Sequence, residues 1–130
     1  MKILVGYDGS NVAKEALKLA RRHARAFGAS VDIVTSMESG TESEQRAIDD
    51  AERGLEWAKT LFDEKGVPCK THLLIRGMSP GEDLVQFARE HAIDEVVVGV
   101  KRRSKVEKIL MGSTAQFVVL QAPCPVVSVK

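Results

Sequence analysis

The segment from Gly99 to Thr114, GVKRRSKVEKILMGST, carries residue types that could bind phosphate. It follows an apolar run and ends on Gly-Ser-Thr, a typical helix start, where free backbone N–H groups and hydroxyls can bind an anion. The basic side chains that could neutralise phosphate are Lys101, Arg102, Arg103, Lys105 and Lys108. An ordinary helix cap and a solvated basic surface would account for the same residues. The segment alone therefore leaves both a phosphate site and a basic connector open.

Asp8 is the second residue with a candidate chemical role, because it follows the apolar run ILVGY and precedes Gly9. Its carboxylate could accept hydrogen bonds from a ribose or a base, or it could face a metal ion. It could instead be a turn residue that bonds its own backbone, as aspartate often does before glycine. The position of Asp8 in the fold has to decide between these interpretations.

Short apolar runs alternate with amphipathic helical patterns along the chain. Strands are predicted at 3–7, 31–37, 69–76, 95–100 and 125–129, and helices at 11–27, 44–65, 79–91 and from 113 onward. This alternation predicts a parallel sheet covered by helices on both faces, with right-handed crossovers. The uniformly apolar strands 3–7 and 95–100 are expected in the middle of the sheet, and 69–76 at an edge with one face wet.

Three serines mark predicted helix starts. Ser10 is expected to cap the first helix, and Ser79 is followed by proline and then by a glutamate three residues after the cap. Ser113 and Gln116 have the spacing of a capping box. The last of these starts lies inside the candidate phosphate segment.

The two candidate segments meet if strands 3–7 and 95–100 are neighbours. In an open parallel sheet, ligands bind at the carboxyl ends of the strands, where the winding direction reverses. The loops YDGS and GVKRR would then lie side by side. The topology therefore predicts a binding crevice between them.

Composition limits the remaining function classes. The 130 residues make one domain, 1–130, and a net charge of +1 gives no global field for nucleic acid or a membrane surface. The chain starts without a signal-peptide pattern and has no apolar run of membrane-spanning length, so we expect a cytoplasmic protein. It contains no Walker loop, no GxGxxG after the first strand and no GxSxG elbow. No catalytic residue and no resident metal site are predicted.

The cysteines and histidines are expected to be structural. Cys69 and Cys124 lack any metal-ligand spacing and are predicted to be reduced, packed thiols. His23, His72 and His91 are scattered over helices and a strand, and we interpret each as a surface or hydrogen-bonded histidine.

The chain resembles the universal stress protein family over essentially its full length. The resemblance rests on ILVGYDGS at the start, on VVVGV before the basic segment, on GST at the last helix and on the closing APCPVVSVK. It implies an α/β three-layer sandwich, Rossmann-like and similar to the adenine nucleotide alpha hydrolases, with a five-stranded parallel sheet of order 3-2-1-4-5. It also implies a regulatory protein of the stress response that forms a homodimer through the last strand, Pro125 to Val129.

One branch of this family binds ATP through a loop written G-x2-G-x9-G-[ST]. Here Gly99 fills the first position, Arg102 stands in place of the second glycine, and residues 103–111 keep the spacing to Gly112 and Ser113. The resemblance implies ATP or another adenine nucleotide as ligand, with a magnesium ion able to bridge the phosphates. The implied nucleotide-binding residues are Asp8, Ser36, Gly99, Arg102, Gly112, Ser113 and Thr114.

Their implied roles differ. Asp8 matches the family's adenosine-contacting acid and would be the one obvious carboxylate near a bridging metal ion. Ser36 lies near the strand position that flanks the adenine, and Thr114 continues the helix start that contacts phosphate.

Three functions stay open, and Arg102 bears on the first two. If the family glycine needs positive φ, arginine costs on the order of 1 kcal/mol or more there, but charge-assisted hydrogen bonds to phosphate contribute about 1.5–3 kcal/mol each. We favour retained nucleotide binding by a dimeric regulatory protein. The alternative is a nucleotide-free dimer that acts through protein contacts, with its site blocked by Arg102. An enzyme is the third hypothesis, and GYDGSN only superficially resembles an adenylating loop.

Overall fold

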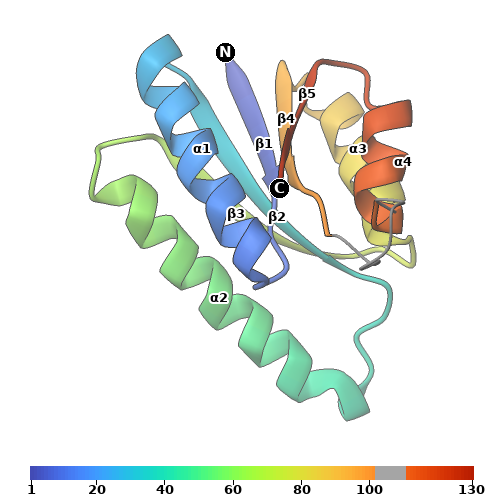
Figure 1. Ribbon diagram of the computed structural model, residues 1–130. Helices are drawn as coiled ribbons and strands as arrows, with labels where there is room; N and C mark the ends of the chain where they lie inside the picture. Colours follow the sequence, from blue (N-terminus) through green and yellow to red (C-terminus); the bar gives the residue numbers. More distant parts are fainter. Residues whose placement is uncertain (102–110) are drawn as a thin grey trace.

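The computed structural model describes residues 1–101 and 111–130, which form a sheet between two pairs of helices (Figure 1). The elements in chain order are β1 Lys2–Gly6, α1 Asn11–Phe27, β2 Ser30–Met37, the 3-10 turn η1 Glu42–Glu44, α2 Gln45–Asp63, β3 Cys69–Ile75, α3 Pro80–Glu90, β4 Glu95–Gly99, α4 Ser113–Gln121 and β5 Val126–Val129. The predicted alternation of strands and helices is therefore confirmed.

The sheet has five parallel strands in the order β3-β2-β1-β4-β5, which confirms the expected topology. β1 lies at the centre, where Val5 pairs with Ile33 of β2 on one side and with Val97 of β4 on the other. β3 and β5 form the edges. The chain winds outward from β1 in both directions, so the carboxyl ends of β1 and β4 lie next to each other.

Each face of the sheet has its own apolar core, and Figure 1 shows α1 and α2 on one face with α3 and α4 on the other. Side chains along β1 alternate between the faces, as the pleat requires. Ile3 and Val5 pack in the core that holds Phe62 of α2, whereas Leu4 packs in the core that holds Phe87 of α3. A sheet buried on both faces explains the continuous apolar runs of its central strands.

The helix starts follow the predicted caps in two cases out of three. The Ser10 hydroxyl accepts a hydrogen bond from the backbone N–H of Ala13, and the Ser79 hydroxyl accepts one from Glu82. The predicted capping box of Ser113 and Gln116 is wrong. Gly112 occupies the N-cap position of α4, and Ser113 is its first residue. Among residues 1–101 and 111–130, no side chain caps the first N–H groups of this helix.

The histidines have partners, as predicted. His23 Nδ1 lies 2.6 Å from Glu95 Oε1, and His91 Nδ1 lies 3.1 Å from the carbonyl oxygen of Phe87. His72 Nε2 lies 2.8 Å from Asp32 Oδ1, and its ring packs 4.9 Å from that of Phe87, centroid to centroid. Because α3 covers His72 in this way, the expectation that β3 has one fully wet face is only partly right.

Both cysteines are free thiols, as predicted. Burial raises the pKa of Cys69 to about 11, because desolvation disfavours the thiolate. Among the residues that the structure describes, no helix is both long and apolar enough to cross a bilayer.

Gly99 permits a close approach of α1 to the end of β4, and this generates a stability prediction. A Cβ at Gly99 would lie 2.9 Å from Val12 Cγ1 and 3.1 Å from the backbone carbonyl of Val12. We expect Gly99→Ala to lower the free energy of unfolding by about 1–3 kcal/mol, because backbone has to move to make room. Urea denaturation measures the loss.

Gly6→Ala is the matched control for this substitution. A Cβ at Gly6 would meet Leu84 Cδ1 at 3.0 Å, which is the end of a side chain that can rotate away. The loss of stability should be clearly smaller than for Gly99→Ala. Equal losses in the two variants would contradict the proposed backbone contact.

Candidate functional site

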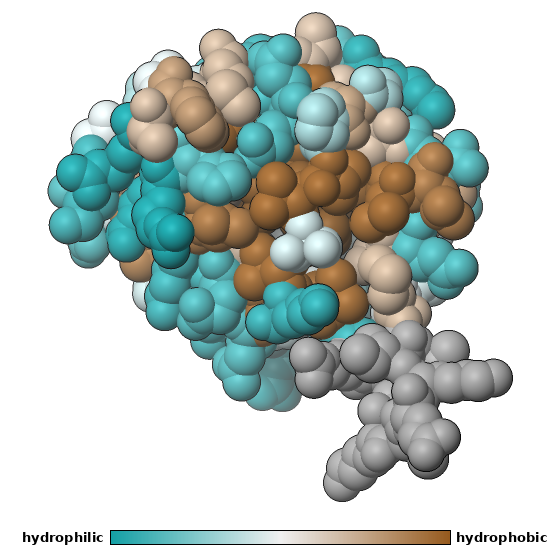
Figure 2. Space-filling view, turned by 45° about the horizontal axis from the view of Figure 1, so that its top comes forward, coloured by the Kyte–Doolittle hydropathy of each residue, from teal (hydrophilic) through white to brown (hydrophobic). Residues whose placement is uncertain are grey.

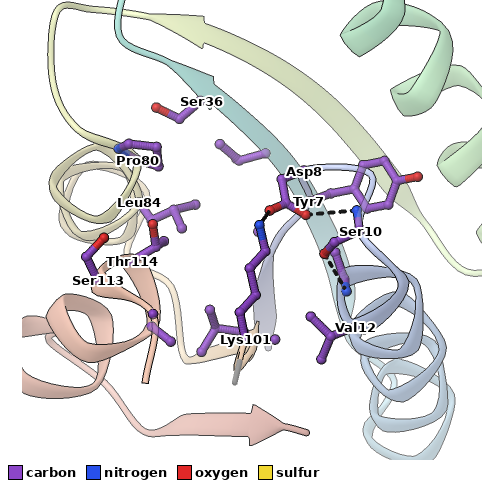
Figure 3. Close-up of a pocket in the computed structure, with 17 residues that line it drawn as sticks. Tyr7, Asp8, Ser10, Val12, Ser36, Pro80, Leu84, Lys101, Ser113 and Thr114 are labelled. Atoms are coloured by element: carbon purple, nitrogen blue, oxygen red, sulfur yellow. Dashed lines mark hydrogen bonds and ion pairs between the residues drawn. The ribbon is translucent and has the colours of Figure 1, made fainter. Parts of the chain in front are cut away.

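A cavity of about 230 Å³ lies at the carboxyl ends of the central strands (Figure 3). Its walls come from the loop after β1, the first turns of α1, the ends of β2 and β4, and the first turns of α3 and α4. The lining residues that the sequence had singled out are Asp8, Ser36, Gly99, Gly112, Ser113 and Thr114. Arg102 lies outside the described residues. The crevice is therefore where the topology placed it, while the binding role of each residue stays a prediction.

Asp8 and Lys101 form an ion pair across the mouth of the cavity, drawn as a dashed line in Figure 3. Lys101 Nζ lies 2.5 Å from Asp8 Oδ2, and the side chains of Lys101 and Asp8 are 52% and 50% exposed. The backbone N–H of Ser10 donates to Asp8 Oδ1 at 3.0 Å. Asp8 is thus both a turn residue and a carboxylate that faces the cavity, so the two interpretations of its role are compatible.

The surroundings of Asp8 keep its carboxylate charged. Burial by itself raises the pKa of Asp8, but hydrogen bonds from Lys101 and Ser10 and the positive charge of Lys101 outweigh it and hold the pKa below the ordinary 3.8. At neutral pH Asp8 therefore accepts hydrogen bonds and is a weak proton acceptor. This chemistry suits the binding of hydroxyl groups better than general base catalysis.

The start of α4 lies on the opposite side of the cavity from α1 (Figure 3). The backbone N–H of Gly112 donates to the carbonyl oxygen of Lys101 at 3.2 Å, which ties the two ends of the segment between them together. The first regular hydrogen bond of the helix runs from Gln116 to Gly112. The N–H groups of Ser113 and Thr114 precede it, so they can bind an acceptor outside the helix.

The lining of the cavity is partly apolar. Val34, Pro80 and Leu84 contribute to it together with Ser36 from the end of β2. Figure 3 shows Pro80 and Leu84 on the same side of the cavity as Ser113 and Thr114. The Ser36 hydroxyl donates to Asp83 Oδ2 at 2.7 Å. The site therefore combines the ion pair of Lys101 and Asp8, the N-terminus of α4 and an apolar wall that carries one hydroxyl.

Sequence reasoning missed the partner of Lys101 and two further lining residues. Lys101 was visible only as one member of a basic cluster, and its partner Asp8 is far away in the chain. Pro80 and Leu84 could have been found from the SPGE helix start, because a helix that follows β3 begins at the same edge of the sheet.

The donor set does not fit a resident metal ion. Asp8 is the one carboxylate that lines the described part of the cavity, and it is paired with Lys101. Within residues 1–101 and 111–130, no group of three or more His, Cys, Asp or Glu side chains could hold a metal. A divalent ion at the described residues would need further ligands, such as the oxygens of a bound phosphate.

Comparisons with known proteins agree with this fold. Residues 1–130 match the profile of the Universal stress protein family. A universal stress protein of Thermus aquaticus is 34% identical, over 98% of this chain and 97% of its own length.

Solved structures agree as well. A universal stress protein from Archaeoglobus fulgidus superposes with a TM-score of 0.88 at 34% identity, covering 100% of this chain and 93% of that one. A second structure from this organism, described as a complex with dAMP, gives a TM-score of 0.85 at 33% identity, with 100% and 98% covered.

The ion pair at the mouth generates a titration prediction. We expect Lys101→Met to raise the pKa of Asp8, because the substitution removes a hydrogen bond and a positive charge and leaves the effect of burial in place. In the wild type the pair persists until the pH falls through the lowered pKa of Asp8. Carboxyl ¹³C shifts followed over pH measure both values.

Lys18→Met is the matched control, since Lys18 pairs with Glu15 on the outer face of α1. It should leave the pKa of Asp8 unchanged. A titration of Asp8 that is the same in the Lys101→Met variant and the wild type would show that the ion pair does not form in solution.

Proposed function

The chain belongs to the universal stress protein family, and we propose that it binds an adenine nucleotide in this cavity as a regulatory protein of the stress response. The observation that carries the proposal is that Asp8, Lys101 and the N-terminus of α4 come together around one cavity. The relative whose structure is described as a dAMP complex is 33% identical over the whole chain, which supports the same class of ligand.

The residues that line the cavity suggest how the nucleotide lies. The phosphates bind at Ser113 and Thr114, where helix N–H groups and hydroxyls act together with the positive charge of Lys101. The ribose hydroxyls donate to the carboxylate of Asp8. They either replace Lys101 as its partner or bind it together with Lys101. The base lies against the apolar wall next to Ser36 and Leu84.

ATP is the proposed ligand, with a magnesium ion bridging its phosphates. The segment that follows Lys101 carries Arg102, Arg103, Lys105 and Lys108, which would balance a triphosphate better than a monophosphate. In this proposal the guanidinium of Arg102 contacts phosphate in place of a glycine backbone. Gly99 and Gly112 hold the ends of the segment at the cavity.

Binding without turnover is proposed, because Asp8 is a poor general base. Its lowered pKa leaves it with little affinity for the proton of an attacking water molecule. A nucleotide that stays bound and intact suits a regulatory signal.

A homodimer through β5 is also proposed. β5 is an edge strand, and on the neighbouring α4 the side chains of Phe117, Val119 and Leu120 are 37%, 45% and 70% exposed. Figure 2 shows a band of hydrophobic residues across one face of the molecule. An edge with exposed apolar neighbours is unstable alone in water, and a second copy would cover it.

A nucleotide-free protein is the second candidate function. The ion pair between Lys101 and Asp8 favours it, since that pair already satisfies the carboxylate that a ribose would use. Arg102 could then close the site, and the basic segment would bind a protein partner.

Calorimetric titration with ATP and magnesium tests the proposed function. We expect saturable binding, and we expect Asp8→Asn to weaken it about tenfold or more, because a hydrogen bond to a charged acceptor contributes about 1.5–3 kcal/mol. Asp50→Asn on the outer part of α2 is the control and should bind as the wild type does. If the wild type gives no heat with ATP, ADP or AMP, and the purified protein releases no nucleotide when denatured, the proposal is wrong.

Arg102→Gly separates the two candidate functions. If Arg102 grips phosphate, the substitution should weaken ATP binding, by roughly the tenfold or more that a lost charge-assisted hydrogen bond implies. If Arg102 blocks the site, the substitution should create binding that the wild type lacks. The same titration distinguishes these results.

Ser128→Pro tests the dimer. β5 bonds to β4 through the carbonyl oxygens of Pro125 and Val129, and because backbone direction alternates along a strand, the N–H of Ser128 faces the open edge. Removing this donor should shift the protein from dimer to monomer in light scattering, whereas Ser128→Ala should not. A dimer that survives Ser128→Pro would place the interface elsewhere.

A further inference from the structure

A buried carboxylate lies directly behind Ser36, which lines the cavity. Asp83 belongs to the first turns of α3 and has an exposed fraction of 0%. Its Oδ2 accepts the hydroxyl proton of Ser36 at 2.7 Å, and its Oδ1 accepts from Arg76 Nε at 2.7 Å. The proposed binding of ribose and phosphate makes no use of this group.

Arg76 pairs with Asp83 and fixes the orientation of its carboxylate. A second guanidinium nitrogen, Nη2, lies 2.5 Å from Asp83 Oδ1, and Nη1 lies 2.8 Å from Glu90 Oε1. A charge this deeply buried would be costly without such a partner. An apolar residue at this position would need no such partner. The chain instead has a buried carboxylate together with the arginine that balances its charge.

The charge of Asp83 fixes the direction of its hydrogen bond with Ser36. A carboxylate only accepts hydrogen bonds, and a serine hydroxyl has one proton to donate. Ser36 therefore donates its proton to Asp83, and its Oγ can only accept a hydrogen bond from any other group. Without Asp83, the same hydroxyl could rotate and serve a ligand either as donor or as acceptor.

We propose that Asp83 is a positioning residue that makes Ser36 a pure acceptor, and that Ser36 thereby selects adenine over bases with a keto group at the same place. The inference rests on the proposed function and adds the selectivity of the site. The 6-amino group of adenine donates to Ser36 Oγ. The 6-keto oxygen of hypoxanthine would instead face the lone pairs of Ser36 Oγ. Neither oxygen could donate to the other, and both would lose their hydrogen bonds to water, which weakens binding.

The position of Ser36 supports this assignment. It lies at the end of β2 and lines the cavity with Pro80, and Figure 3 shows it on the side away from Lys101, Ser113 and Thr114, the groups that suit phosphate. A base placed there meets few polar groups, so a single hydroxyl with a defined polarity can decide which base fits.

Competition between ATP and ITP measures the proposed selectivity, since the two ligands differ only at position 6, amino or keto, and at the adjacent N1, which carries a proton in hypoxanthine and none in adenine. We expect the wild type to bind ATP about tenfold or more tightly than ITP. Ser36→Ala should bring the ratio close to one, mainly through weaker ATP binding. Asp83→Asn should also lower the ratio, through tighter ITP binding, because its amide can donate to Ser36 and release the serine proton for a keto oxygen.

Ser39→Ala and Asp32→Asn are the matched controls. Ser39 bonds to Glu44 in an exposed loop, and Asp32 is a buried aspartate that pairs with His72 away from the cavity. Both should keep the wild-type ratio. The ratio is informative because a variant that is merely less stable would lose ATP and ITP binding together.

The outcomes separate the two proposals. Equal affinity of the wild type for ATP and ITP, or a ratio that neither Ser36→Ala nor Asp83→Asn changes, overturns the selectivity and leaves nucleotide binding intact. A ratio that responds to Ser36→Ala but not to Asp83→Asn overturns the role of Asp83. No binding of either nucleotide overturns the proposed function and this inference with it.

Discussion

The parallel pairing of β1 with β4 is the constraint on which the site depends. It sets Val5 beside Val97, and so brings the two strand ends, with Asp8 after one and Lys101 after the other, to the same place. α1 leaves toward one face of the sheet and α4 toward the opposite face (Figure 1). The divergence of these connections opens the cavity, as expected where the winding of an α/β sheet reverses.

One ion pair at the site is exposed and the other is buried behind it. Around Lys101 and the start of α4, partial and full positive charges face solvent-accessible space, where they can exchange one anionic partner for another. Behind Ser36, the charge of Asp83 is buried and paired with Arg76. An exposed ion pair contributes little to stability and is easily replaced, whereas a buried one keeps its neighbours in a fixed arrangement. The exposed pair of Lys101 and Asp8 therefore suits ligand exchange, and the buried pair of Asp83 and Arg76 suits selectivity.

Much of this architecture could be predicted from the sequence. The strands, the helices and the meeting of Asp8 with the segment from Gly99 follow from local periodicity and from the rule for parallel sheets. The cap of α4 could not be predicted, because Gly112 and Ser113 are both acceptable caps and the tertiary position of the helix decides between them. The hydrogen bond from Ser36 to Asp83 could not be predicted either, since the sequence around Asp83 does not indicate which polar residue of α3 faces the sheet.

The central claim is that the cavity at the ends of β1 and β4 binds an adenine nucleotide. Titration of the ¹⁵N-labelled protein with ATP and magnesium, followed by amide chemical shifts, tests it most directly. We expect saturable shifts at Asp8, at Ser36 and from Ser113 to Ala115, which line the cavity. Amide shifts that do not change with ATP, or that change only at the opposite end of the sheet around Gly28 and Gly66, would contradict it.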